Sequence, residues 1–161
     1  MFPCLVPTVL LIALLPAQAT SYRYLGHHFT TVMSPYTTDD SVSGSFNTSA
    51  PLEANRPLSP VTLTSFSFSD GIQILTNLNA TPLVFEISTD GSGNIEWWVI
   101  QLTANSCLSV DACGIVAVHT VLSGDGGQII PPTAAMAQGY VKDKPGAWTA
   151  DTNPNTLPLG P

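Results

Sequence analysis

Apolar and polar residues alternate along most of the chain between residues 20 and 130. The stretch SVSGSFNT places Val42 and Phe46 on one side of an extended backbone and serines on the other, and SFSFS repeats the pattern with Phe66 and Phe68. Successive side chains of a strand point to opposite faces. The alternation therefore predicts strands with one apolar and one polar face, which are typical of antiparallel sheets that have one side in water.

Turn residues separate these strands. Asp70-Gly71 lies between SFSFS and IQILTN, and this dipeptide favours a two-residue hairpin turn. The loop DGSGN joins LVFEIST to IEWWVIQL and predicts a second hairpin. GIVAVHTVL is apolar on both faces, as expected of a central strand. About seven or eight such strands predict an all-β fold, an antiparallel, jelly-roll-like β-sandwich, with a closed barrel as the alternative.

The first residues depart from this pattern. Residues 1–19 contain a short apolar run followed by Ala17-Gln18-Ala19, which is typical of a signal peptide cleaved after residue 19. The run is shorter than the roughly 20 residues of a membrane-spanning helix, although an uncleaved N-terminal anchor is the alternative. We therefore expect a signal peptide over 1–19 and a secreted, extracellular protein.

The C-terminal part loses the alternation after Pro131. AAMAQGY, residues 134–140, is rich in alanine and is the candidate for a short helix, and Trp148 is expected to dock on the body of the protein. We expect a single β domain over 20–149, followed by a disordered, proline-rich tail over 150–161.

Charge narrows the choice of partners. The chain contains four Lys and Arg residues and 11 Asp and Glu residues, which gives a net charge of −7. An acidic protein repels phosphate backbones, so nucleic acid is not an expected partner. No stretch resembles a basic amphipathic helix, and no stable membrane insertion is expected after cleavage.

Two cysteines follow the predicted cleavage site, Cys107 and Cys113 in NSCLSVDACG. A close, even pair in an exported protein predicts a disulfide, with two free thiols as the alternative. Closing a loop this short contributes roughly 2.4 kcal/mol in the chain-entropy description.

The hairpin loop beside the tryptophans carries oxygen atoms at every second position. The residues are Asp90, Ser92, Asn94 and Glu96. This spacing begins like a calcium loop, but the positions where an EF-hand needs Gly and a bidentate Glu hold Ile95 and Gln101. Two interpretations stay open, a turn closed by side-chain hydrogen bonds and a weak Ca²⁺ site. No other cofactor is expected.

Trp97 and Trp98 are adjacent, so a strand points them to opposite faces. Trp97 is expected in the core with Ile95 and Val99. Trp98 is either part of a second covered face or an exposed platform that stacks on a sugar or a partner. The sequence leaves these two roles of Trp98 open.

Catalytic motifs are scarce. The chain has no Gly-x-Ser-x-Gly elbow and no His-Glu-x-x-His motif. Glu86 and Glu96 are the carboxylates that a hairpin could bring to glycosidase separation, although both are equally suited to a solvated face. No catalytic residue is expected, and the protein is expected not to be an enzyme.

Three further motifs favour structural roles. The pair His27-His28 is expected on the surface, because adjacent strand residues diverge. His119 shares a face with apolar residues and is expected to lie in the core or to be half-buried. SGDGGQ, residues 123–128, is glycine-rich but lacks the lysine of a phosphate-binding loop, so it is predicted to be a turn.

Several motifs together resemble a known group of proteins. YRYLGHHFTT, SPYTTDDSVSGSF, APLEANRPLS, SFSFSDG and FEISTDGSGNIEWWVI occur in this order over residues 22–102. They resemble exported bacterial proteins that often carry a Pro-Glu-Pro sorting signal (PEP-CTERM) processed by exosortases, in which Asn-Pro is more frequent where this chain has His27-His28. The resemblance implies secretion, an all-β fold and a role at the cell surface or in extracellular matrix. It supplies no catalytic residues. The sorting signal is not found in the final NPNTLPLGP, so anchoring by that route is not expected.

These observations favour a secreted, non-enzymatic cell-surface or extracellular-matrix protein with a structural or adhesive role. The alternative is a carbohydrate-binding module with Trp98 as its aromatic platform and a Ca²⁺ loop at Asp90. Expected partners are extracellular polysaccharide or other surface proteins. A hydrolase that uses Glu86 and Glu96 is a third, weaker hypothesis.

Overall fold

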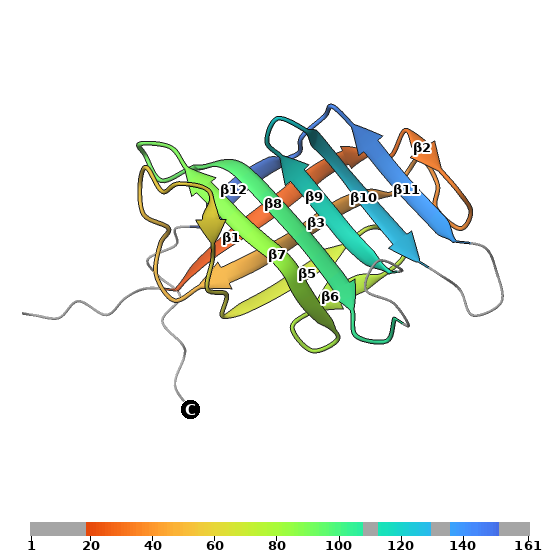
Figure 1. Cartoon of the computed structure of the whole chain (residues 1–161), viewed down its shortest axis with the longest axis horizontal. Coiled ribbons are helices and arrows are strands. Elements are labelled where there is room, and N and C mark those ends of the chain that lie inside the picture. The colour runs from red at the N-terminus through yellow and green to blue at the C-terminus, as the bar shows by residue number, and fades with distance from the viewer. Residues whose placement is uncertain (1–18, 108–112, 130–135, 152–161) are drawn as a thin grey trace, which may run out of the picture.

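The computed structural model describes residues 19–107, 113–129 and 136–151. In this part of the chain twelve strands form two antiparallel sheets, which are stacked face to face (Figure 1). The predicted all-β sandwich is confirmed, and the sheets do not close into a single barrel. Most of the predicted signal peptide, residues 1–18, and residues 152–161 of the predicted tail lie outside the described residues.

The smaller sheet contains five strands. Its order is β12 (Ala147–Asp151), β1 (Thr20–His28), β3 (Ser41–Thr48), β5 (Ser65–Ser69) and β6 (Ile74–Thr76). The predicted alternation is confirmed here, because Val42, Phe46, Phe66 and Phe68 are buried while the intervening serines point away from the core.

The larger sheet contains seven strands. Its order is β2 (Thr31–Val32), β11 (Ala137–Lys142), β10 (Ser123–Ile129), β9 (Gly114–His119), β8 (Ile95–Ala104), β7 (Ala80–Thr89) and β4 (Ser59–Pro60). Strands β7 to β11 follow one another as a meander, a simpler connection than a jelly roll uses. As predicted, β9 is central in the sheet. The described strands outnumber the predicted ones because β2 and β4 are too short to show alternation and because β10, β11 and β12 were not predicted as strands.

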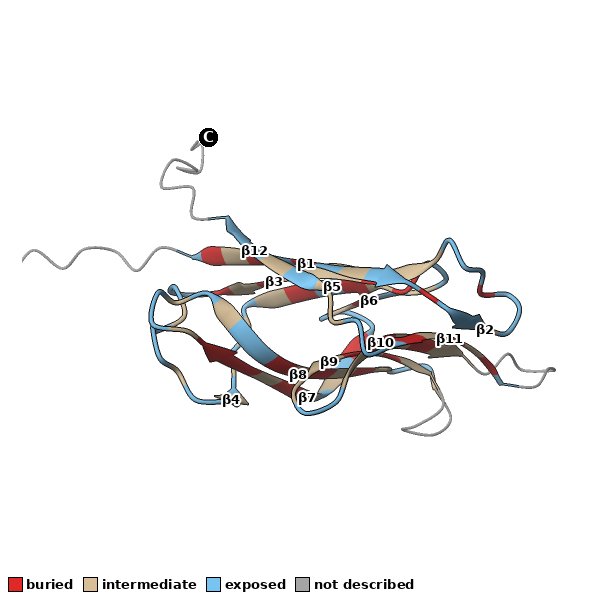
Figure 2. Cartoon of the chain, turned by 90° about the horizontal axis from the view of Figure 1, so that it is seen from above, coloured by how far each residue is buried: buried red, intermediate tan, exposed pale blue. Residues whose placement is uncertain are grey.

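Aromatic side chains fill the space between the sheets, and the buried residues of both sheets face each other (Figure 2). Trp148 of β12 packs against this core, with its ring centroid 4.8 Å from that of Tyr24 and 5.3 Å from that of Phe46. The predicted docking of Trp148 is therefore confirmed. Strand β12 pairs with β1 as far as Asp151, so Ala150 and Asp151 belong to a strand rather than to the predicted tail.

Two predictions near the C-terminus are wrong. SGDGGQ is not a turn but most of β10, and the residues of AAMAQGY from Ala137 onward form β11 rather than a helix. Pairing with neighbouring strands overrides the helical preference of alanine here. The glycines of β10 serve close packing, because a Cβ atom at Gly127 would collide with the carboxylate of Asp70 from the opposite sheet.

Within the described residues, no helix has the length and apolarity that a membrane span requires.

Candidate functional site

The outer face of the seven-stranded sheet carries a hollow. The described residues form two layers (Figure 2), and no third layer of described residues covers this face. Strand register places Tyr140, Gly126, Val116 and Gln101 side by side in one row across β11, β10, β9 and β8. Because Gly126 has no side chain, the surface is recessed there between the side chains of Tyr140 and Val116.

A groove of about 250 Å³ follows this row; we call it the outer groove. A second row beside the first consists of Gln138, Gln128, Gly114 and Thr103. The lining residues are Gln101, Leu102, Thr103, Cys113, Gly114, Val116, Gly126, Gly127, Gln128, Gln138, Gly139 and Tyr140. The glycines form its floor, and an aromatic ring and three side-chain amides form its walls.

None of these described lining residues carries a charge at neutral pH. Amide side chains both donate and accept hydrogen bonds, and a tyrosine ring offers an apolar face with a polar tip. The ammonium of Lys142 lies 5.3 Å from the centre of the Tyr140 ring, outside the lining. The groove is therefore suited to an uncharged ligand with many hydroxyl groups.

The predicted disulfide lies at one end of the groove. Cys107 and Cys113 are bonded, with their Cα atoms 5.9 Å apart. Cys113 lines the groove and directly precedes Gly114 of β9. The bond thus ties the start of β9 to the residues that follow β8.

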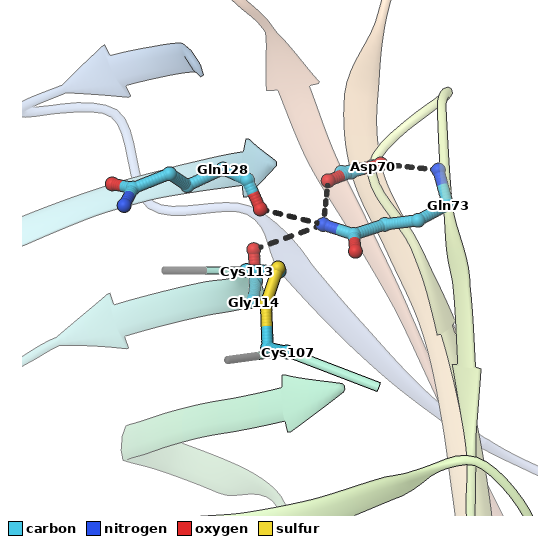
Figure 3. The surroundings of a disulfide bond; sticks show 6 residues. All are labelled: Asp70, Gln73, Cys107, Cys113, Gly114 and Gln128. Carbon is cyan, nitrogen blue, oxygen red and sulfur yellow. Dashed lines mark hydrogen bonds between the residues drawn. A yellow bond between two sulfur atoms is a disulfide. The ribbon is translucent and has the colours of Figure 1, made fainter. Parts of the chain in front are cut away.

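Gln73, in the loop between β5 and β6, contacts the same end from the side of the smaller sheet (Figure 3). The Nε2 group of Gln73 donates to the backbone oxygens of Gly114 and Gln128, each at 3.1 Å, and to Oδ2 of Asp70 at 2.7 Å. Gly114 and Gln128 both line the groove. This contact fixes the groove floor to the opposite sheet.

Asp70 is buried at the end of β5 rather than exposed in a surface turn. Its Oδ1 accepts from the backbone N–H groups of Ile72 and Gln73, and its Oδ2 accepts from the hydroxyl of Tyr36 at 2.6 Å. The pKa of Tyr36 is raised, mainly by burial and to a smaller extent by the hydrogen bond to Asp70. These bonds satisfy a carboxylate that burial would otherwise destabilise.

Asp125 of β10 is the second buried carboxylate, and it is less well satisfied. Tyr24 donates to its Oδ1 at 2.7 Å, while no described residue bonds its Oδ2. Burial raises the pKa of Asp125 to about 7. The pKa of Tyr24 is raised as well, first by burial and then by the charge of Asp125.

The two tryptophans lie on opposite faces, but Trp97 is not the core residue that the sequence predicts. Trp98 is 4% exposed and belongs to the core, so the prediction that it is a ligand platform is wrong; Trp97 is 39% exposed and points outward. The reason is that Trp98 alternates regularly with the buried Ile100 and Leu102. A β-bulge precedes the two tryptophans, since Ser88 pairs with Trp97 and Thr89 with Ile95, which leaves Glu96 without a partner on β7. The extra residue puts Ile95 on the core side together with Trp98.

The Asp90 loop has the geometry of a side-chain-closed turn. Oδ1 of Asp90 accepts from the backbone N–H groups of Ser92 and Asn94, and its Oδ2 accepts from the side-chain amide of Asn94 at 3.0 Å. These hydrogen bonds lower the pKa of Asp90, and the bond from the Asn94 side chain has the largest effect. Glu96 lies outside this network, in the bulge, so the four predicted calcium-loop residues do not converge in this structure.

The two glutamates of the hydrolase hypothesis do not face each other. Glu86 pairs with Val99, which lies three residues from Glu96, or about 10 Å along β8 at the usual rise per residue. No cluster of three or more His, Cys, Asp or Glu residues with metal-binding geometry occurs in the described part of the chain.

The histidine predictions are confirmed. His27 and His28 are exposed, and His119 is half-buried. The His119 ring lies against both tryptophans, with centroid distances of 4.8 Å in each case.

Sequence reasoning missed the residues that line the outer groove. Gln128, Gln138 and Tyr140 belong to the two strands that were predicted to be a turn and a helix. A signal existed in the spacing of Gln138, Tyr140 and Lys142, which alternate with Ala137, Gly139 and Val141, but small residues made this alternation weak.

No family model, curated protein or solved structure matches the chain. The geometry of the site therefore carries the functional argument.

Proposed function

We propose that the chain is a secreted, non-enzymatic adhesive protein of the cell surface or extracellular matrix that binds an uncharged polysaccharide in the outer groove. The observation that carries this proposal is the lining of the groove, which combines the Tyr140 ring with the amides of Gln101, Gln128 and Gln138 and includes no charged side chain. This joins the adhesive role and the carbohydrate-binding role that the sequence favours, with Tyr140 in place of Trp98.

The position of the groove favours a glycan over a peptide. Peptides often bind to a sheet by adding a strand at its edge, where backbone groups are unpaired. The outer groove lies over β8 to β11, where the backbones already pair with one another. A ligand there is recognised by side chains, and the amides match the donors and acceptors of sugar hydroxyl groups.

Charge supports the same choice. The chain carries a net charge of −7, which disfavours anionic polymers such as nucleic acids and uronate-rich polysaccharides. A neutral polysaccharide experiences no such repulsion. The resemblance of several motifs to exported surface proteins supports a location outside the cell.

The proposal is tested by retention on insoluble neutral polysaccharides. The secreted protein, the Tyr140→Ala and Tyr140→Phe variants and a matched surface control, Ser67→Ala on the outer face of the other sheet, are passed over cellulose, starch, xylan and mannan. Wild type, Tyr140→Phe and Ser67→Ala are expected to bind at least one of them, and Tyr140→Ala to bind about fivefold less, since stacking on an aromatic ring contributes on the order of 1 kcal/mol.

The variants are first compared by thermal unfolding, so that loss of binding is not mistaken for loss of the fold. Equal retention of Tyr140→Ala and wild type would show that the groove is not the binding site. Failure of the wild type to bind any neutral polysaccharide would contradict the proposal.

A further inference from the structure

The outer face holds a second exposed aromatic ring beyond the groove. Trp97 is 39% exposed on β8, and its ring stacks on that of His119 with centroids 4.8 Å apart and planes inclined by 21°. His119 is itself held, because its Nδ1 lies 2.8 Å from the hydroxyl oxygen of Ser123. The indole is therefore positioned before any ligand arrives, which reduces the entropic cost of stacking on it.

Trp97 lies on the same face as the groove and in line with it. Gln101 lines the groove, and Trp97 precedes it by four residues on β8. An even separation keeps two strand residues on one face. At about 3.3 Å per residue, the two positions lie about 13 Å apart.

The surface between these positions is apolar and lies between two charged residues. Val99 and Val118 are paired in the row that separates Trp97 from the groove. The same row continues through Gly124 to Lys142 on one side and through Glu86 to Pro60 on the other. A strip without charge thus runs along β8 and β9 from the groove to Trp97.

We infer that the outer groove and Trp97 form one extended site for a linear, uncharged oligosaccharide that runs along β8 and β9. This inference rests on the proposed function and names its ligand class more closely. A single sugar ring does not bridge positions about 13 Å apart, so the ligand is a chain. An unbranched β-1,4-linked chain fits best, because it is extended and presents flat ring faces to Val99, Val118 and the indole.

The inference predicts a dependence on chain length that requires Trp97. β-1,4-linked gluco-oligosaccharides from the disaccharide to the hexasaccharide are titrated calorimetrically into the wild type and into Trp97→Ala, Trp97→Phe and Tyr140→Ala. Wild-type affinity should rise by about tenfold once the chain spans both positions, as expected for one added aromatic contact. Trp97→Ala should lose this rise but bind short chains normally, Trp97→Phe should keep part of it, and Tyr140→Ala should weaken binding at every length.

The outcomes separate this inference from the proposed function. Equal affinity of wild type and Trp97→Ala at every length, or no binding of any oligosaccharide in this series, would overturn the extended site. In either case, retention of a neutral polysaccharide that depends on Tyr140 would leave the proposed function standing. If the protein also fails to retain any neutral polysaccharide, both the extended site and the proposed function are contradicted.

Discussion

Asp125 is an acidic side chain with an incomplete set of hydrogen bonds in the core. One of its carboxylate oxygens has no partner among the described residues, and its pKa is raised to about 7 by burial. In an unfolded chain an aspartate titrates near 3.9. Between about pH 4 and pH 7 the folded protein therefore holds a proton that the unfolded chain releases. By linkage, the contribution of Asp125 to stability is most favourable below about pH 4. This contribution is lost as the pH rises to the folded-state pKa of about 7.

We predict that the free energy of unfolding falls between about pH 4 and pH 7 and then levels off. One pKa unit corresponds to about 1.4 kcal/mol, so the loss is on the order of a few kcal/mol. Asp125→Asn is neutral at every pH and should remove the decline in urea titrations. Asp90→Asn is the control, since the pKa of Asp90 is lowered and its ionisation does not change in this range. A decline that persists in Asp125→Asn would refute the assignment.

Trp97 and Trp98 differ in environment although they are adjacent. Trp98 is 4% exposed and its ring lies 6.0 Å from that of Trp148 in the core. Trp97 is 39% exposed and its ring stacks on that of His119. Regular alternation with the buried Ile100 and Leu102 assigns Trp98 to the core.

This difference predicts unequal costs for the same substitution. Trp98→Ala leaves a cavity in the core and should lower the free energy of unfolding by about 3–5 kcal/mol. Trp97→Ala removes a side chain from the surface and should cost under about 1 kcal/mol. Chemical denaturation of the two variants measures both values. Similar losses in the two variants would show that the assignment of the layers is wrong.

At the scale of elements, β10 connects the two sheets. It contributes Asp125 to the core, its Gly127 makes room for Asp70 of the opposite sheet, and its Gln128 backbone oxygen accepts from Gln73. The strand thus combines two close approaches with a polar contact. The same strand supplies the floor of the outer groove, which links recognition to the packing beneath it.

Gln73→Ala should show the contribution of this link. The substitution removes the donor that serves Gly114, Gln128 and Asp70, and the loss of these hydrogen bonds, one of them to a carboxyl group, is expected to cost roughly 1–3 kcal/mol. Gln101→Ala, which changes a glutamine on the outer face, is the matched control and should leave stability within about 0.5 kcal/mol. Equal stability of Gln73→Ala and wild type in urea titrations would contradict the bridging role.

The sequence identified the elements that alternate clearly and missed those built on small residues. Phe66 and Phe68 mark β5 because large apolar side chains recur at every second position. In β10 the glycines provide no such contrast, although their absence of side chains is what the fold requires there. Register adds a second limit, because the bulge at Glu96 depends on the partner strand, and a single extra residue exchanges the faces of a strand.

At the scale of the whole molecule, one layer faces outward with the groove and the other stabilises it. The core aromatic residues, the buried carboxylates and the disulfide hold the seven-stranded sheet in one shape. A rigid face of this kind binds with little loss of conformational freedom, which favours affinity for an extended ligand. The candidate site could not be predicted from the sequence because it arises from four strands side by side rather than from a local motif.

The most direct test of this account is a map of backbone amide NMR shifts during titration with a neutral oligosaccharide that the protein retains. We predict that the largest changes fall on Gln101, Val116, Gln128, Gln138 and Tyr140, around the outer groove. The serine-bearing face of β3 and β5 should not respond. Changes confined to that opposite face, or no saturable change with any neutral oligosaccharide, would contradict the account.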